Sequence, residues 1–128
     1  MASKKTLHGV FVTALEGGIG YWSTCSKYQW STGDGTTDDL NGFHAIVSDT
    51  EDEDAVPFRI DAELVQRGIT QFIAKDFNPR HSGYVRIQRL CLALQRGGSA
   101  AEDALCEMDA SDADCIVQMG HFNEVVYG

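Results

Sequence analysis

Residues 56–65 read VPFRIDAELV, and within this stretch the spacing of apolar side chains changes from two to about 3.6. Val56, Phe58 and Ile60 alternate, which predicts a short strand with these three side chains facing inward. Asp61 then suits a helix N-cap, because its carboxylate can accept a backbone N–H of the next turn. The stretch therefore predicts that strands give way to helices at residue 61.

Two more strand candidates lie upstream of this stretch. Residues 21–30, YWSTCSKYQW, combine aromatic and hydroxyl side chains and have strand character. Residues 43–48 form the next candidate, and the acidic residues 49–54 are expected to make a solvated hairpin connection. Because side chains alternate along a strand, one face of residues 21–30 would carry Trp22, Thr24, Ser26, Tyr28 and Trp30.

Helical periodicity appears at both ends of the chain. Ser3 or Thr6 could cap a first helix, and Gly17 is expected to end it in a left-handed conformation. Its apolar positions are Leu7, Val10, Phe11, Ala14 and Leu15.

Two later helices have their own start signals. Ser99 with Glu102 matches the capping-box pattern, and Ser111 is expected to start the last helix. Gly68 is expected to weaken the helix that follows Asp61 by about 1 kcal/mol relative to alanine.

The order of elements predicts an α+β domain in which helices cover one face of a small antiparallel sheet. The expected strands, about three, span residues near 21–30, 43–48 and 56–60. The expected helices, four to five, span residues near 5–16, 61–76, 83–96, 99–108 and 111–119. We expect residues 1–128 to form a single compact domain, because a chain of this length suits one core.

The chain is acidic, with 19 Asp and Glu against 10 Lys and Arg and a formal net charge of −9. This balance argues against sequence-independent nucleic-acid binding and against anionic membranes. No apolar run approaches the roughly 20 residues that cross a bilayer. The short apolar stretch near the start, which contains His8, does not fit a signal peptide. We therefore expect a cytoplasmic protein.

The cysteines and acidic clusters predict no metal site and no cofactor. Cys25, Cys91, Cys106 and Cys115 form no C-x-x-C pair and match no zinc module, so we interpret them as reduced thiols. The acidic run at 49–54 lacks the alternating ligands and central glycine of an EF-hand.

One region of the chain is basic. Residues 77–101 contain no Asp or Glu but hold four arginines. A helix is expected to begin near Ser82, and the free amide groups and dipole at a helix start attract anions. This predicts a phosphate or carboxylate pocket whose ligand-binding residues are Arg80, His81, Ser82, Arg86 and Arg89. The alternative is that the arginines pair with acidic neighbours on a solvated helix face.

Residues 16–22, EGGIGYW, form the second candidate site. Glycine allows close backbone approach, and the Tyr-Trp pair supplies flat rings that can stack on a base. The stretch does not satisfy the G-x-G-x-x-G dinucleotide pattern. The alternative is a helix stop and a bulged strand whose aromatic rings belong to the core. The expected stacking and loop residues are Glu16, Gly17, Gly18, Gly20, Tyr21 and Trp22.

The patterns TALEGGIGYW near the start and DADCIVQMGHFNEVVYG near the end resemble a set of small uncharacterised proteins encoded by bacteriophages of actinobacteria. Those proteins carry EGG-x-x-YW early and an aspartate-rich, IVQ-containing end that closes on VVYG. The resemblance implies a phage accessory protein acting in the host bacterial cytoplasm, and it implies no particular activity. The matching positions are Glu16, Gly17, Gly18, Tyr21, Trp22, Asp112, Asp114, Ile116, Val117, Gln118, Val125, Val126 and Tyr127.

Three functional hypotheses follow. The first is non-catalytic binding of a small anionic ligand such as a nucleotide, by a homo-oligomer, because one small domain encloses little. The second is a protein–protein module that inhibits a host bacterial protein, with an acidic surface for a basic partner and exposed aromatic anchors. The third is a small enzyme using Glu16 or His81 as acid or base. It ranks last, because no nucleophile, base and orienting group align, and the sequence names no catalytic residue.

Overall fold

A computed structural model describes residues 1–29, 42–78, 80 and 82–128. Helix α1 (Lys4–Gly17) leads through a 3-10 turn, η1 (Ile19–Tyr21), into strand β1 (Ser23–Gln29). Strands β2 (His44–Asp49) and β3 (Phe58–Asp61) follow. The chain continues through helices α2 (Ala62–Ala74), α3 (Ser82–Arg96), α4 (Gly98–Glu107) and α5 (Ala110–Phe122).

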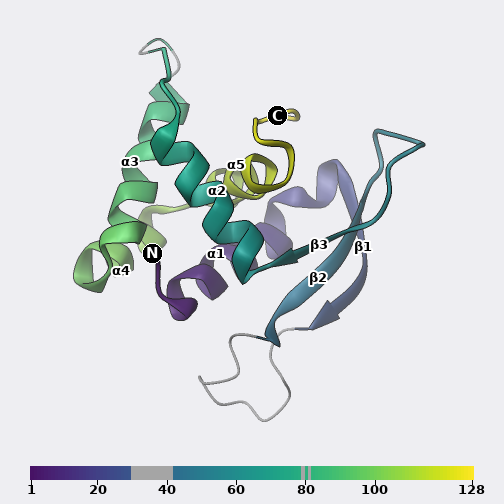
Figure 1. Cartoon of the computed structure of the whole chain (residues 1–128), viewed down its shortest axis with the longest axis horizontal. Coiled ribbons are helices and arrows are strands. Elements are labelled where there is room, and N and C mark those ends of the chain that lie inside the picture. Colours follow the sequence, from purple (N-terminus) through teal and green to yellow (C-terminus); the bar gives the residue numbers. More distant parts are fainter. Residues whose placement is uncertain (30–41, 79, 81) are drawn as a thin grey trace.

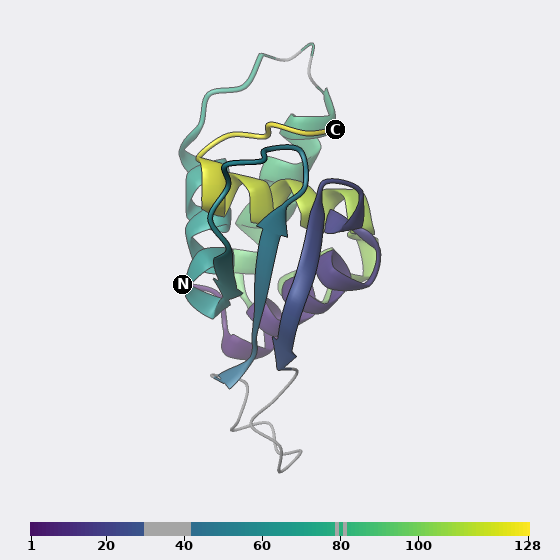
Figure 2. The same cartoon turned by 90° about the vertical axis from the view of Figure 1, so that its right-hand side faces the viewer.

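The predicted α+β architecture is confirmed. The strands form an antiparallel sheet in the order β1-β2-β3, and the helices lie against one of its faces (Figures 1 and 2). Ala45 and Val47 of β2 are fully buried on the helix side, whereas Ile46 between them keeps some exposure. The alternation expected of a sheet with one solvated face is therefore present.

Helix α5 forms the centre of the core. Its residues 112–120 are all buried, and it packs against both α1 and α2. The crossing with α2 occurs at two glycines. A Cβ on Gly68 would collide with the backbone carbonyl oxygen of Ile116, and one on Gly120 would collide with that of Leu64. Gly68, which was expected only to weaken its helix, thus allows the two helices to approach closely.

Two predicted helix caps are confirmed. The Ser3 hydroxyl accepts the backbone N–H of Thr6 at 3.2 Å, and the Asp61 carboxylate accepts that of Leu64 at 3.0 Å. No helix in the described part of the chain is long and apolar enough to span a bilayer.

The predicted capping box at Ser99 and Glu102 is wrong. Helix α4 already begins at Gly98, and its N-cap is Gly97, which makes no side-chain cap. Gly97 and Gly98 have φ values of 80° and 59°, a conformation that glycine adopts without strain. The chain therefore turns directly from α3 into α4, and Ser99 falls inside the helix.

The last helix starts earlier than Ser111. Asp109 is the N-cap, its carboxylate accepts the backbone N–H of Asp112 at 2.9 Å, and the Asp112 carboxylate accepts that of Asp109 at 3.0 Å. A capping box thus exists here, built from two aspartates rather than from serine and glutamate.

The predicted faces of the strands need two corrections. Val56 is 80% exposed and precedes β3, so only Phe58 and Ile60 of the alternating set lie on that strand. In β1 the register shifts between Cys25 and Lys27, so that Cys25 and Tyr28 pair with the inward-facing Val47 and Ala45. This β-bulge moves Tyr28 to the face opposite the predicted one. Trp30 lies outside the described residues.

Candidate functional site

Two arginines of the predicted anion pocket, Arg86 and Arg89, face carboxylates. Arg86 donates to the Asp112 carboxylate at 2.7 Å and to the Glu107 carbonyl at 3.3 Å. The hydrogen bond to Asp112 raises the pKa of Arg86. Arg89 lies 3.5 Å from the Glu107 carboxylate, in a more exposed pair. Both guanidinium groups therefore have anionic partners within the protein, as the solvated-face alternative expects.

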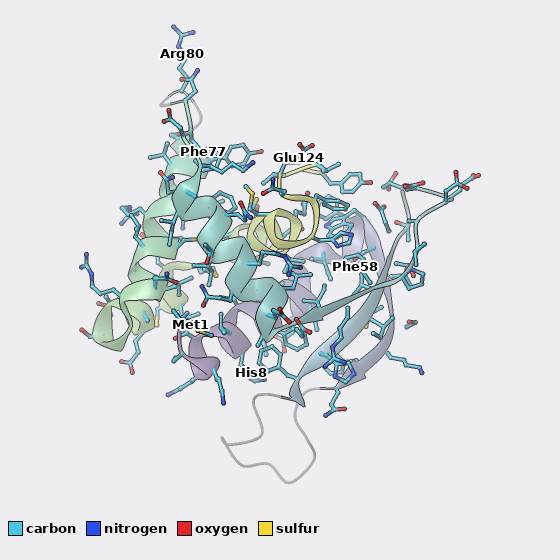
Figure 3. All side chains as sticks on the ribbon, in the orientation of Figure 1. Met1, His8, Phe58, Phe77, Arg80 and Glu124 are labelled. Atoms are coloured by element: carbon cyan, nitrogen blue, oxygen red, sulfur yellow. The ribbon has the colours of Figure 1, made fainter. Side chains whose placement is uncertain are left out.

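The rest of that predicted pocket is not assembled around them. The Arg80 side chain extends away from the body of the molecule (Figure 3). Ser82 is exposed at the start of α3, and His81 lies outside the described residues. The arrangement argues against a common anion site for Arg80, Ser82, Arg86 and Arg89.

The glycines of EGGIGYW shape the end of α1. The predicted left-handed conformation of Gly17 is wrong, because Gly17 is the last residue of α1 and has no positive φ. The chain continues through Gly18, at φ −100°, directly into η1. A Cβ on Gly18 would lie 2.6 Å from the carbonyl oxygen of Ala110, so this glycine allows α1 to meet the start of α5. Gly20 has open space around it and lies in η1.

The two aromatic residues of the motif have different roles. Trp22 is fully buried and stacks on Tyr127, with ring centroids 5.4 Å apart. Tyr21 is 55% exposed, but its hydroxyl donates to the Asp114 carboxylate at 2.7 Å. Burial and the bond to Asp114 raise the pKa of Tyr21. Trp22 thus belongs to the core, and Tyr21 presents an anchored ring to solvent.

A buried polar network joins this motif to the C-terminal one. Asp114 also accepts the Trp22 indole N–H at 2.8 Å and the Gln118 amide at 3.0 Å. The Gln118 side chain, fully buried, accepts the backbone N–H groups of Val126 and Tyr127, each at 2.8 Å, and donates to the Tyr127 carbonyl. Gln118 therefore holds the segment after α5 in the way that a neighbouring strand would.

Asp114 and Gln118 form the centre of this network, and neither of them was assigned a role from the sequence. Their spacing of four places both on one face of α5. In the sequence alone, an aspartate-rich start followed by a glutamine is typical of a solvated helix, so the pattern did not indicate that these two polar side chains are buried. The resemblance named both positions, and the structure shows that they contact Tyr21 and Trp22 from the other motif.

A hollow of about 370 Å³ lies between the end of α2, the start of α3 and the C-terminal segment that follows α5. Phe77 and Tyr84 contribute a pair of rings with centroids 5.6 Å apart. Lys75 and Glu124 bring opposite charges to the lining, and no ion pair within the described ranges involves either of them. The lining residues are Lys75, Phe77, Tyr84, Met119, Glu124 and Val125.

The walls of this hollow are fixed by two buried or half-buried glutamines. Gln88 of α3 donates to the carbonyl oxygens of Phe72 and Lys75, at 2.9 and 2.6 Å, and so caps the end of α2. Gln118 holds Val126 and Tyr127, which directly follow the lining residue Val125. Side-chain hydrogen bonds therefore hold backbone groups on two sides of the hollow, which favours a pre-organised site.

The described residues assemble no metal centre around Glu16 or the cysteines. Glu16 lines a smaller hollow of about 280 Å³ with Leu15, Cys25 and Tyr28. No group of three His, Cys, Asp or Glu side chains in the described part of the chain could hold a metal ion. All four cysteines are free, and burial raises the pKa of Cys91 and Cys115 to about 12, so neither ionises near neutral pH.

Three comparisons with known proteins found no match. No protein-family model matches the chain, and no curated protein or solved structure shows significant similarity to it.

The Tyr127–Asp49 bond predicts a pH dependence at alkaline pH. The Tyr127 hydroxyl donates to Asp49 at 2.7 Å, and this bond, with some burial and the nearby acidic charges, raises the pKa of Tyr127 from 10.0 to about 12. Because the raised pKa favours the protonated phenol in the folded state, its contribution to stability is complete below pH 10 and is lost as the pH rises to about 12. We expect Tyr127→Phe to remove this part of the pH dependence, measured by urea unfolding across that range. If the unfolding free energy changed with pH equally in both proteins, this prediction would be wrong.

Proposed function

We propose that this protein is a non-catalytic binding protein and that its hollow between α2, α3 and the C-terminal segment holds a small, flat, anionic ligand such as a nucleotide. The observation that carries the proposal is the combination of the Phe77–Tyr84 ring pair with Lys75 and Glu124 around one space of about 370 Å³. Pockets for small ligands are commonly about 300–1,000 Å³, mostly apolar, with a few polar groups. This hollow has both properties.

Each side chain would recognise a different part of such a ligand. The rings of Phe77 and Tyr84 offer a surface on which a base can stack. The Lys75 ammonium would contact a phosphate as a point charge, and the Glu124 carboxylate would accept hydrogen bonds from an amino group of the base. Figure 3 shows Phe77 and Glu124 at the same end of the molecule, although Phe77 precedes α3 and Glu124 follows α5.

The proposal differs from the sequence hypothesis in its location. The sequence placed the anion at Arg80–Arg89, where Arg86 and Arg89 have carboxylate partners. Lys75 precedes that stretch and Tyr84 lies within it, and neither Lys75 nor Glu124 forms an ion pair among the described residues. The expected homo-oligomer remains a prediction, which native mass spectrometry of the purified protein tests together with any co-purified ligand.

We expect adenosine and guanosine monophosphates to stabilise the protein, and Lys75→Gln to weaken their binding by about tenfold, the value of one charge-assisted hydrogen bond. A bound nucleotide at a hundredfold excess over its Kd raises the unfolding free energy by about 2.7 kcal/mol. Thermal unfolding and calorimetry measure both effects.

Two controls make this test specific. Lys27→Gln removes the same charge from β1, away from the hollow, and should bind like the original protein. Adenosine, which lacks the phosphate, should bind the original protein and Lys75→Gln equally. The proposal is wrong if no nucleotide binds, or if Lys27→Gln and Lys75→Gln weaken binding to the same extent.

A further inference from the structure

Three segments that are distant in the sequence meet at one end of the molecule. The α1–β1 connection, the β2–β3 connection and the C-terminal segment lie close together in Figure 2. Hydrogen bonds join them: Thr50 donates its backbone N–H to the Trp22 carbonyl at 2.8 Å, and Tyr127 donates to Asp49. We define the end patch as the exposed or half-exposed residues Tyr21, Asp49, Glu51, Asp52 and Val126.

The apolar side chains of the end patch are exposed although their attachments are rigid. Tyr21 is 55% exposed and Val126 is 45% exposed. The Tyr21 hydroxyl is held by Asp114, and the backbone N–H of Val126 is held by the buried Gln118. A ring held by its hydroxyl, and a short side chain on a backbone that is itself held, lose little conformational entropy on binding, which is a property of anchor residues at protein interfaces. Tyrosine is also enriched among such anchors.

Carboxylates of β2 and the β2–β3 connection lie beside Tyr127, the residue that follows Val126. Asp49 and Tyr127 are in contact, Glu51 donates its backbone N–H to the Asp49 carboxylate at 2.8 Å, and the charges of Asp52 and Glu51 act on the Tyr127 hydroxyl. No ion pair within the described residues involves an acid from 49 to 54. The end patch therefore combines two exposed apolar side chains with neighbouring carboxylates that form no ion pair among the described residues.

We infer that the end patch is a docking surface for a basic segment of a partner protein. An apolar side chain of the partner would pack against Tyr21 and Val126, and its Lys or Arg side chains would pair with Asp49, Glu51 and Asp52. Charge complementarity of this kind selects the partner and accelerates association, while the apolar contact supplies affinity. The inference does not depend on the ligand hollow, whose lining shares no residue with the end patch.

The test is an NMR titration of the full chain with two synthetic peptides. One peptide alternates leucine with lysine and arginine, and the other has the same leucines with aspartate and glutamate. We expect the basic peptide to shift the amide signals of Tyr21, Glu51 and Val126, with an affinity that falls as salt is added. The acidic peptide should shift none of them.

Two variants of matched chemistry separate the end patch from the rest of the surface. Val126→Ser should weaken binding of the basic peptide by about fivefold or more, because it shortens the apolar centre while its backbone bond to Gln118 remains. Leu92→Ser, at a 50% exposed residue on α3, should bind the peptide unchanged. The amide spectrum of each variant shows directly whether it is folded.

Several outcomes of the titration would overturn the inference. These are the absence of binding, equal binding of both peptides, shifts spread over the acidic residues of α4, or equal losses in the two variants. A shift of the end-patch signals with protein concentration alone would also overturn it, because a second copy of this chain would then be the occupant.

Discussion

Gly68→Ala is expected to lower the unfolding free energy by at least about 3 kcal/mol, at the upper end of the usual cost of overpacking. The added methyl group would collide with the backbone carbonyl oxygen of Ile116, and its nearest side-chain neighbour is the γ-methyl of the same residue at 3.1 Å. A helix carbonyl cannot rotate away without breaking its own hydrogen bond, so α2 and α5 would have to separate. Alanine's higher helix propensity returns only about 1 kcal/mol.

Gly83→Ala is the matched control, because Gly83 is also helical and a Cβ there meets nothing within 4 Å. We expect this variant to be as stable as the original protein or more stable by up to about 1 kcal/mol. Urea unfolding measures both variants. If Gly68→Ala retained the stability of Gly83→Ala, the close crossing of α2 and α5 would be wrong. Gly120→Ala should resemble Gly68→Ala, and the double variant should lose less than the sum.

Asp114→Ala is expected to cost at least about 3 kcal/mol of unfolding free energy. The change leaves the indole N–H of Trp22 and one N–H of the Gln118 amide without their acceptor inside the core, and each unsatisfied buried donor costs about 1–3 kcal/mol. Asp114→Asn should cost less, because its amide oxygen can still accept from Trp22. Urea unfolding gives the energies, and near-ultraviolet circular dichroism reports the packing of the aromatic rings.

Asp103→Ala serves as the control, because Asp103 is an exposed aspartate of α4. It should change stability by no more than about 0.5 kcal/mol, as most surface substitutions do. Equal stabilities of Asp114→Ala and Asp103→Ala would show that the buried network does not hold the two motifs together.

Much of the fold was predictable because local patterns agreed with the tertiary structure. The change of apolar spacing at residue 61 correctly separates strands from helices, and Ser3 and Asp61 cap the helices that they precede. The errors occur where distant contacts decide. The bulge after Cys25 reverses a strand face, and the direct turn at Gly97 replaces the capping box expected at Ser99.

The candidate site was much less predictable, because its residues are brought together only by packing. The sequence shows that the arginine stretch is basic, but the α3–α4 hairpin and the capping box of α5 place Glu107 and Asp112 beside it. The hollow combines Lys75, Phe77 and Tyr84 with Met119, Glu124 and Val125. No local period or spacing relates these segments, so the sequence alone could not bring them together in one hollow.

The burial of α5 has a consequence for biosynthesis. A ribosome releases α1, the sheet and α2 before α5 exists, so these elements emerge with their apolar faces uncovered. Their native contacts with α5 are long-range in sequence, and such contacts delay folding. We therefore expect the nascent chain to stay open to proteases and chaperones until α5 has left the exit tunnel, and then to fold in one step.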